Sequence, residues 1–318
     1  MLMNDQVQVA VGVLVNTAGQ VLLAKRAEKV HQGGLWEFPG GKCAPGESAS
    51  QALQRELYEE LGVVVRQCRP LILIRHQYAD RQLALQVYKV TAWDNEPSGR
   101  EGQPICWVDP QQLVKYPMPA ANESIIRAIQ LPDRYLITPA ILTEASHFLR
   151  ELDLALAQGA RLIQFRVFGE QSEIYAELVL SAVDVCRAAG ADLVLNASVA
   201  QAQSLGVDGV HLNNRRLWTC QARPTSFRWL AASCHNMADI QQAERIGADF
   251  VVLSPVCTTP SHPDAQTLGW EQFAAWAAGA TIPVYALGGM MDDKLPIALK
   301  FGAQGIAGIR GLWPGFVK

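Results

Sequence analysis

The pattern of apolar and polar positions divides the chain into two regions with different predicted secondary structure. Strand-like runs occupy residues 7–15, 20–25, 70–75, 83–92 and 104–108 of the first region. A long loop rich in Gly and Pro spans residues 27–47. Helices are predicted over residues 48–61, with Ser48 at the N-cap position and Gly62 just past the end, and over residues 122–130. The first region therefore mixes helices and strands, as in the α+β class.

After Leu131-Pro132-Asp133, short apolar runs alternate with helical stretches. The runs are YLIT (135–138), LIQFRV (162–167), DLVLN (192–196), GVHL (209–212), WLAASC (229–234), FVVLSPV (250–256), PVYALGG (283–289) and GIAGIR (305–310). Such runs are typical of a parallel sheet covered on both faces, and eight in series predict an α/β fold, the (β/α)8 barrel. About 185 residues is short for that fold, and the final WPGFVK leaves no room for a closing helix. We expect two domains, residues 1–132 and 133–318.

Composition and charge exclude several classes of protein. With 49% hydrophobic and 18% charged residues among 318, the chain is neither disordered nor fibrous. Because 27 basic residues face 30 acidic ones, no basic excess predicts binding to a nucleic-acid polymer. No apolar run predicts a membrane span, and no basic leader predicts a signal peptide. Seven cysteines without CxxC pairs favour free thiols in a reducing cytoplasm.

Three glutamates crowd one face of the helix predicted over residues 48–61. Glu56, Glu59 and Glu60 have the spacing i, i+3 and i+4, at which like charges destabilise an isolated helix. A hard divalent cation such as Mg²⁺ or Mn²⁺, held by oxygen ligands, would offset this repulsion. A solvated acidic face is the alternative that these three residues alone leave open.

The neighbouring residues extend this pattern to a longer motif. The stretch reads Gly41, five residues, Glu47, seven residues, and then Arg55-Glu56-Leu57-Tyr58-Glu59-Glu60-Leu61-Gly62-Val63. It agrees with the Nudix box at every fixed position, so residues 1–132 resemble Nudix hydrolases. The resemblance implies an α/β/α sandwich that cleaves a nucleoside diphosphate linked to a further group, with Mg²⁺ held by the glutamates of the box.

The same resemblance assigns roles to the carboxylates. It implies that Glu56, Glu59 and Glu60 are the metal ligands, and Gly40 is added to that metal set. Glu101, in the loop GREGQP, is the candidate for an outlying carboxylate that assists the metal or takes a proton from the attacking water. Which carboxylate acts as the base stays open.

Two other features of the box are expected to support the carboxylates. Arg55 is expected to point away from the metal face and to orient Glu47 through a bidentate pair. Gly40 and Gly41 are expected to let the loop pack closely on the helix, because a residue without a Cβ permits such an approach.

Further segments narrow the resemblance to one branch of the family. HQGGLWEFPGGKCAPGE, EGQPICWV and PAANESII are similar, in order and spacing, to the MutT-type 8-oxo-dGTP diphosphatases. The resemblance implies hydrolysis of 8-oxo-dGTP to 8-oxo-dGMP and pyrophosphate, which removes a mutagenic nucleotide. It also implies that Asn122 pairs with the oxidised purine edge, since an amide offers both a donor and an acceptor. An N-cap of helix 123–130 is the alternative role for Asn122.

The candidates for substrate contact in this region are Arg26, Phe38, Gly40, Gly41 and Asn122. Phe38 is either a wall for the base or an aromatic residue of the core. Arg26, at the end of the second strand, is either a phosphate or base contact or half of an exposed salt bridge. Tyr78 and Arg81 are candidates for the rim of the pocket, and His31 receives no role.

The second region resembles a different family. IQFRV, DGVHL, SCHN, SPVCTTPSHPDA and ALGGM, within residues 135–311, are similar to thiamine phosphate synthases and their TenI-like relatives. Barrels of this kind bind phosphate at the loops after strands seven and eight, where Gly288, Gly289 and Arg310 lie. Thr259 and Ser261 offer hydroxyl donors, so a phosphorylated thiazole-type ligand is the expected partner.

Departures from the synthase pattern argue against synthase activity. The synthase pattern has a lysine soon after the arginine of the second strand, whereas Arg166 is followed by Val167-Phe168. The pattern has Asn-Asp-Arg after the third strand, where this chain has Asn196-Ala197-Ser198. Its acidic loop after the fourth strand is here Asn213-Asn214-Arg215-Arg216, and its lysine in the sixth loop is here His262. The two lost carboxylates predict loss of the Mg²⁺ that binds pyrophosphate.

Histidines of the second region leave the function of the barrel open. His235 matches the proton-moving histidine of TenI-like thiazole tautomerases, and a pKa near neutrality suits that role. A histidine left over in a decayed pocket is the alternative. His211, at the end of the fourth strand, is expected to be packed or at the rim. The barrel is therefore a tautomerase or a module that binds a phosphorylated ligand, and a thiamine-related pyrophosphate is the alternative substrate of the Nudix region.

Overall fold

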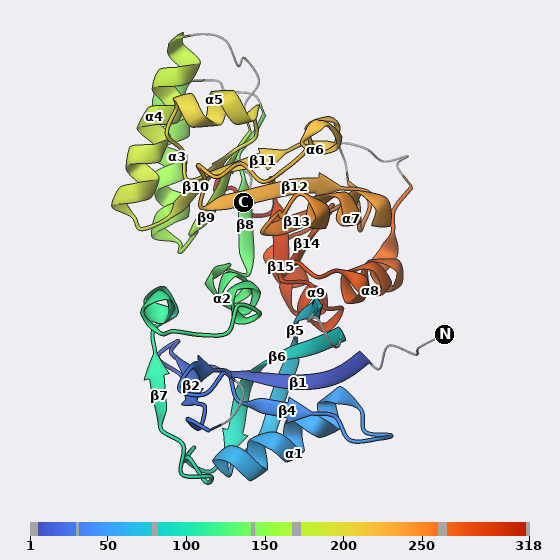
Figure 1. Cartoon of the computed structure of the whole chain (residues 1–318). Helices are drawn as coiled ribbons and strands as arrows, with labels where there is room; N and C mark the ends of the chain where they lie inside the picture. Colours follow the sequence, from blue (N-terminus) through green and yellow to red (C-terminus); the bar gives the residue numbers. More distant parts are fainter. Residues whose placement is uncertain are drawn as a thin grey trace. The chain divides into compact units, whose positions relative to one another are not determined.

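The computed structural model describes residues 6–29, 32–77, 82–140, 144–166, 173–259 and 266–315 (Figure 1). The chain folds as two compact units, Met1–Gln130 and Leu131–Lys318. Within the described ranges, no helix has the length and apolar character needed to cross a membrane. All seven cysteines are free thiols.

The first unit is built from two small sheets with helices on either side. Its strands are β1 (Gln6–Leu14), β2 (Val21–Lys25), β3 (Trp36–Glu37), β4 (Gly40–Lys42), β5 (Val64–Gln77), β6 (Gln82–Asp94) and β7 (Ile105–Val108), and its helices are α1 (Ala49–Leu61), the 3-10 helix η1 (Pro110–Lys115) and α2 (Asn122–Gln130). One sheet has the order β4-β1-β6-β5, in which β1 and β6 are parallel and the other pairs are antiparallel. The second sheet is antiparallel, with the order β3-β2-β7.

Helix α1 packs closely on one face of the larger sheet. A capping box fixes its start, because the Ser48 side chain accepts from the backbone N of Gln51 while the Gln51 side chain accepts from the backbone N of Ser48. Gly62, with a φ of 75°, ends the helix in the left-handed conformation predicted for that position. A Cβ on Gly12 of β1 would lie 2.9 Å from Leu57 Cδ1, so the bare backbone there lets the helix approach the sheet.

The opposite face of the sheets carries a second apolar cluster. Phe38, Leu113, Ile125 and Ala128 are buried there, and they come from the loop after β3, from η1 and from α2. Together with α1 on the first face, these elements form three layers (Figure 1). The predicted α/β/α sandwich is therefore confirmed.

The structure corrects two predictions of secondary structure in this unit. The sequence predicts a loop over 27–47, but this stretch contains β3 and β4, which are too short and too rich in glycine to give an alternating pattern. The run 70–75 is only part of β5, which begins at Val64. Pro70 lies next to one of three register shifts between β5 and β6, and β5 is at the edge of its sheet, where proline is tolerated.

The second unit is a closed barrel of eight parallel strands, as predicted. Its strands are β8 (Arg134–Ile137), β9 (Leu162–Phe165), β10 (Asp192–Leu195), β11 (Gly209–Leu212), β12 (Trp229–Cys234), β13 (Phe250–Leu253), β14 (Val284–Leu287) and β15 (Gly305–Gly308). Its helices are α3 (Ala145–Ala157), α4 (Glu173–Ala188), α5 (Val199–Ser204), α6 (Asn214–Thr219), α7 (Met237–Arg245), α8 (Gly269–Gly279), η2 (Asp292–Lys294) and α9 (Leu295–Lys300). The ring closes where Ile306 of β15 pairs with Arg134 of β8.

Alternate residues of each strand enter two separate apolar clusters. Tyr135, Trp229, Phe250 and Tyr285 point into the barrel and fill it. The residues between them point outward and meet the surrounding helices, as Phe165 does against Phe148 of α3. The barrel is thus a packed core, in which the polar side chains of Gln164 and His211 are also buried.

Trp313 packs against α3, the first helix of the barrel. It follows β15, is fully buried, stacks on Phe148 with ring centroids 5.3 Å apart, and its indole N–H donates to Glu151 of α3. The side chain of Trp313 thereby fills the space between β15 and α3.

Replacing Trp313 tests how much this packing stabilises the barrel. Trp313→Ala is expected to lower the free energy of unfolding by about 3–5 kcal/mol, because it removes a large buried ring and leaves Glu151 without its donor. Denaturant unfolding followed by circular dichroism measures the change. Ile174→Ala, at a site that is 73% exposed on α4, is the matched control and should cost about 0.5 kcal/mol or less. Equal midpoints for the two variants would contradict the role of Trp313.

Candidate active site

Helix α1 presents its carboxylates from a firmly held frame. Ala52, Leu53, Leu57 and Leu61 are fully buried and fix the apolar face of the helix. The polar face is left with Arg55, Glu56, Glu59 and Glu60, whose positions follow from the 3.6-residue period. Burial of the apolar face therefore places the acidic residues together on the polar face of α1.

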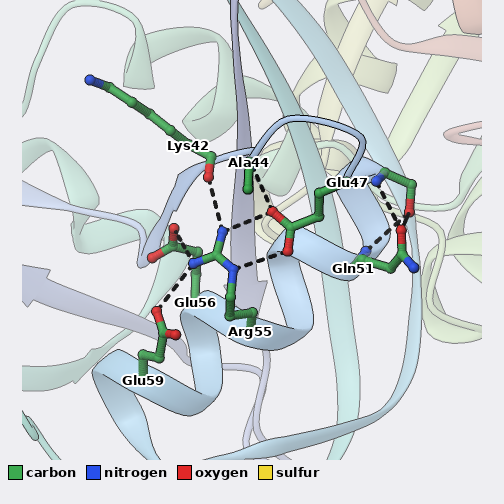
Figure 2. Close-up of polar contacts among 8 residues, drawn as sticks. Lys42, Ala44, Glu47, Gln51, Arg55, Glu56 and Glu59 are labelled. Carbon is green, nitrogen blue, oxygen red and sulfur yellow. Dashed lines mark hydrogen bonds and ion pairs between the residues drawn. The ribbon is translucent and has the colours of Figure 1, made fainter.

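Arg55 is the centre of the ionic contacts on α1 (Figure 2). Its Nε and Nη2 donate to the two carboxylate oxygens of Glu47 at 3.0 and 2.9 Å, which is the predicted bidentate pair. Its Nη1 also donates to Glu56 at 2.9 Å and to Glu59 at 3.1 Å. The prediction that Arg55 points away from these glutamates is therefore wrong, because the long side chain reaches its helical neighbours. This pairing lowers the pKa of Glu47.

Glu60 lies in a different environment from the other glutamates of the box. Its Oε2 accepts a hydrogen bond of 3.1 Å from the backbone N of Gly40. Burial raises the pKa of Glu60 to about 8, and the negative charges of Glu37, Glu56 and Glu101 act in the same direction. The carboxylates therefore lie close enough to repel one another, and Glu60 is the one that gives up its charge.

Glu101 reaches this cluster because its loop is tied to the carboxyl end of α1. The Nε2 of Gln103 donates to the backbone O of Glu60 at 3.0 Å, and the backbone N of Ser98 donates to the O of Leu61 at 3.0 Å. Helix carbonyls at this end lack partners within the helix, so the loop satisfies them. Sequence reasoning missed Gln103, and the only available signal was an amide two residues after Glu101.

The two loop glycines of the motif make different contacts. A Cβ on Gly41 would lie 2.2 Å from Cδ of Glu56, so the missing side chain lets the loop lie against this carboxylate of α1, as predicted, and a larger residue would push the carboxylate aside. A Cβ on Gly40 would instead lie 2.2 Å from the backbone O of Ala10. The bare backbone of Gly40 therefore lets the loop approach strand β1, while its N–H donates to Glu60 of α1.

The donor set fits a hard divalent cation. Glu56, Glu59 and Glu60 supply carboxylate oxygens within two turns, and the absence of a side chain at Gly41 leaves space beside Glu56. Within the described ranges, however, no three acidic, His or Cys side chains already converge as a ligand cage. Arg55 holds Glu56 and Glu59 in this structure, so these two side chains would have to exchange partners when a cation binds.

Among the described residues of this unit, Asn122 has a buried side-chain nitrogen without a hydrogen-bond partner. It is the first residue of α2, not the residue before it, and its side chain is 7% exposed. Its Nδ2 is buried and has no hydrogen-bond partner among the described residues. An unpaired buried donor is costly, which favours a role in ligand binding over the N-cap role.

The remaining candidates of the first unit have structural contacts. Arg26 forms a half-buried ion pair with Glu37 of β3, and burial raises the pKa of Glu37. Phe38 is 3% exposed within the cluster that contains Ile125 of α2, so it is a core residue. The predictions for His31, Tyr78 and Arg81 lie outside the described residues.

The barrel candidates lie at the carboxyl ends of the strands. His235 is exposed, and its Nδ1 lies 2.9 Å from the backbone O of Ser254. Gly288 and Gly289 have φ values of 105° and 66° and face the backbone of the segment 255–258. Thr259 is among the described residues, whereas Ser261 and His262 are not. His211 is packed, as expected, and is only 1% exposed.

The buried carboxyl of Glu60 has a consequence for stability. Since its pKa is raised from 4.5 to about 8, the folded chain keeps a proton that the unfolded chain releases between these pH values. The free energy of unfolding of the metal-free protein therefore falls as the pH rises through this window. Glu60→Gln should abolish that fall. Denaturant unfolding with a chelator at about pH 5.5 and about pH 8.5 measures the difference.

Glu59→Gln is the matched control, because Glu59 is 54% exposed on the same turn. It should retain the pH dependence of the wild type. A Glu60→Gln variant whose stability still falls between the two pH values would contradict the assignment to Glu60.

Comparison with known proteins identifies both units. Residues 10–128 match the family model described as NUDIX domain, and residues 134–312 match that described as Thiamine monophosphate synthase. The 8-oxo-dGTP diphosphatase of Proteus vulgaris is 41% identical over 102 residues, which cover 32% of this chain and 91% of that protein. The CTP pyrophosphohydrolase of Escherichia coli is 33% identical over 118 residues, which cover 37% of this chain and 87% of that protein.

The second unit has relatives of its own. The thiamine-phosphate synthase of Chloroflexus aurantiacus is 30% identical over 175 residues, which cover 54% of this chain and 81% of that protein. Both resemblances inferred from the motifs are thereby confirmed. The chain belongs to the Nudix hydrolases through its first unit and to the thiamine monophosphate synthase family through its second.

Proposed function

We propose that the first unit hydrolyses 8-oxo-dGTP to 8-oxo-dGMP and pyrophosphate with Mg²⁺, and so removes a mutagenic nucleotide. The observation that carries the proposal is the buried Nδ2 of Asn122, which has no partner among the described residues. The similarity to a relative named 8-oxo-dGTP diphosphatase supports the same substrate.

The chemistry of Asn122 suits a purine edge. A buried amide N–H without an acceptor costs about 1–3 kcal/mol, and a ligand that supplies an acceptor recovers this energy. The amide oxygen of the same side chain accepts from an N–H of the ligand, so both ends of the amide read the base. A base with the wrong donor and acceptor pattern leaves these groups unpaired, which is how such a site rejects it.

The glutamates of α1 would hold the cation. Glu56, Glu59 and Glu60 are the proposed ligands of Mg²⁺, or of Mn²⁺ in its place, with Gly40 beside them. When bound, the cation supplies neutralisation of the phosphate charge. Water adds to phosphorus, the bond to the pyrophosphate oxygen breaks, and a carboxylate of this cluster takes the proton of the water. Glu101 joins the cluster as the proposed outlying carboxylate.

Arg55 and Glu47 act as positioning residues in this proposal. The bidentate pair fixes the guanidinium on one side, and Nη1 then bonds Glu56 on the other. A guanidinium held at two edges fixes the carboxylate of Glu56 more tightly than a single lysine ammonium would. Arg26 and Gly41 are proposed as further substrate contacts, whereas Phe38 is a core residue.

Variants of Asn122 test the substrate. Asn122→Ala is expected to lower kcat/KM for 8-oxo-dGTP by about 10- to 100-fold, because a paired amide contributes that much discrimination. Its kcat/KM for dGTP should change less. Steady-state assays with product identification measure both values for 8-oxo-dGTP, dGTP, CTP and thiamine pyrophosphate.

Two further variants make the result interpretable. Glu123→Ala changes the next, exposed residue of α2 and should behave as the wild type. Glu56→Gln should abolish turnover while the protein stays folded. The proposal is wrong if the wild type prefers CTP or thiamine pyrophosphate, or if Glu56→Gln retains near-normal activity.

We propose further that the barrel does not couple the precursors of thiamine phosphate. Ala197 stands where the synthase pattern carries an aspartate, and the segment 213–216 has no carboxylate where that pattern is acidic. His235 keeps the role of a proton-transfer residue for a phosphorylated thiazole-type ligand. Its Nδ1 faces the backbone O of Ser254, which leaves Nε2 as the basic nitrogen. Thr259, Ser261, Gly288 and Gly289 are the proposed phosphate contacts.

An assay of synthesis tests this second proposal. The full chain, supplied with the phosphorylated pyrimidine and thiazole precursors and Mg²⁺, is expected to form no thiamine phosphate above the background without protein. Chromatography of the products measures this. Robust formation of thiamine phosphate would overturn the proposal, whatever the outcome of the nucleotide assays.

A further inference from the structure

The loop of residues 95–103, which carries Glu101, is docked on the carboxyl end of α1. The last carbonyls of a helix have no partners within it, and donors of this loop satisfy them. The acceptors are the carbonyl oxygens of Tyr58, Glu60, Leu61 and Gly62, and the donors belong to Asn95, Ser98, Arg100 and Gln103. The loop is therefore positioned by the same helix that presents Glu56, Glu59 and Glu60.

Gln103 joins Glu101 directly to this helix. Its Nε2 donates to the backbone O of Glu60 at 3.0 Å, and its Oε1 accepts from the backbone N of Glu101 at 2.8 Å. A side-chain amide has donors at one end and an acceptor at the other, so both bonds together fix its orientation. The backbones of Glu101 and Glu60 are thereby connected through one planar group.

The backbone of the loop folds tightly enough to bring Gln103 into this position. The backbone N of Gly102 donates to the O of Gly99 at 3.1 Å. A Cβ on Gly99 would lie 1.9 Å from the backbone O of Gln103, so only a glycine lets the chain return this closely. Gln103 is half-buried as a result, and water competes less for its two bonds than it would at an exposed position.

Arg100 anchors the loop on the other side of Glu101. Its guanidinium lies 5.0 Å from the ring centroid of Tyr58, and its Nη1 donates to the backbone O of the same residue at 3.3 Å. A cation at the carboxyl end of a helix is favourable because of the helix dipole. Glu101 therefore lies between two fixed residues. It is exposed, and its negative charge acts on Glu60.

We propose that Gln103 is a positioning residue for the hydrolysis, which holds the carboxylate of Glu101 in register with the glutamates of α1 by bonding the backbones of Glu101 and Glu60. Gln103 itself touches no substrate. A misplacement of about 1 Å in a reacting group can cost about 100-fold in rate, so a residue of this kind can control kcat. The inference rests on the proposed function, in which Glu101 is the outlying carboxylate, but it does not depend on which base the nucleotide carries.

A double-mutant cycle tests whether Gln103 acts through Glu101. Gln103→Met keeps the length of the side chain and removes both hydrogen bonds, and Glu101→Gln removes the charge but keeps the backbone N that Gln103 binds. Glu101→Gln is expected to lower kcat by about 100-fold. Gln103→Met should lower kcat by about tenfold or more and change KM by less than about threefold. In the Glu101→Gln background, however, Gln103→Met should lower kcat by less than about twofold.

The assays use the full chain with Mg²⁺ and the nucleotide that the wild type hydrolyses best. A preference for a nucleotide other than 8-oxo-dGTP would therefore overturn the proposed substrate and leave the cycle valid. Gln112→Met is the matched control, because it makes the same change on the exposed surface of η1, and it should keep the kcat of the wild type. Additive effects in the cycle would mean that Gln103 is merely structural, and they would overturn the proposal. A kcat near that of the wild type in Gln103→Met or in Glu101→Gln would overturn it as well.

Amide hydrogen exchange measures the contact itself, without metal or substrate. The N–H of Glu101 should exchange at least about tenfold faster in Gln103→Met than in the wild type or in Gln112→Met, because it loses its acceptor. Gln103→Glu keeps an acceptor for this N–H but has no donor for the carbonyl of Glu60. It should therefore keep the slow exchange and still lose kcat as Gln103→Met does. Equal exchange in the wild type and Gln103→Met, or full kcat in Gln103→Glu, would contradict the positioning role.

Discussion

The repulsion among carboxylates on α1 is the constraint on which the first unit depends. Glu59 and Glu60 lie in the last turn of the helix, where the macrodipole disfavours negative charge, and no basic residue of that turn offsets it. The helix is stable there because its apolar face is fully buried against the sheet, with Leu57 over the bare backbone of Gly12. Packing thus provides the stability that the acidic face removes.

The carboxylates near α1 are accommodated in two different ways, by ion pairs with Arg55 and by burial of Glu60. Arg55 is shared among Glu47, Glu56 and Glu59, and this pairing lowers the pKa of Glu47. Glu60 lies deeper and has a backbone N–H of Gly40 as its partner, which is too little to hold a full charge there. A cation that binds the carboxylates of this helix would therefore displace both a guanidinium and a proton.

The barrel solves the burial of polar groups in the opposite way. Inside the barrel, a line of hydrogen bonds connects the amides of Asn196 and Gln164, the phenol of Tyr135 and the imidazole of His211. Arg216, which is half-buried, donates to the amide of Asn196 at one end of this line. A neutral chain whose hydrogen bonds are made costs little in a low dielectric.

Local features of the fold were predictable, and features that depend on distant partners were not. The capping box at Ser48 and the left-handed Gly62 are written within a few residues, and so is the run of eight apolar strands. The reach of Arg55 to Glu56 and the docking of Gln103 depend on side-chain conformations that the one-dimensional pattern does not encode. Trp313 offered no periodic signal, because it packs as a single residue outside the described helices and strands.

Two glycines of the Nudix box illustrate why the motif was recognisable although its geometry was not. Gly62 is needed for its backbone, since a φ of 75° strains any residue with a Cβ. Gly41 matters because it has no side chain, since a Cβ would push the carboxylate of Glu56 aside. Both positions are simply glycine in the sequence. Only the packed structure separates the conformational role of Gly62 from the steric role of Gly41, which brings the loop against Glu56.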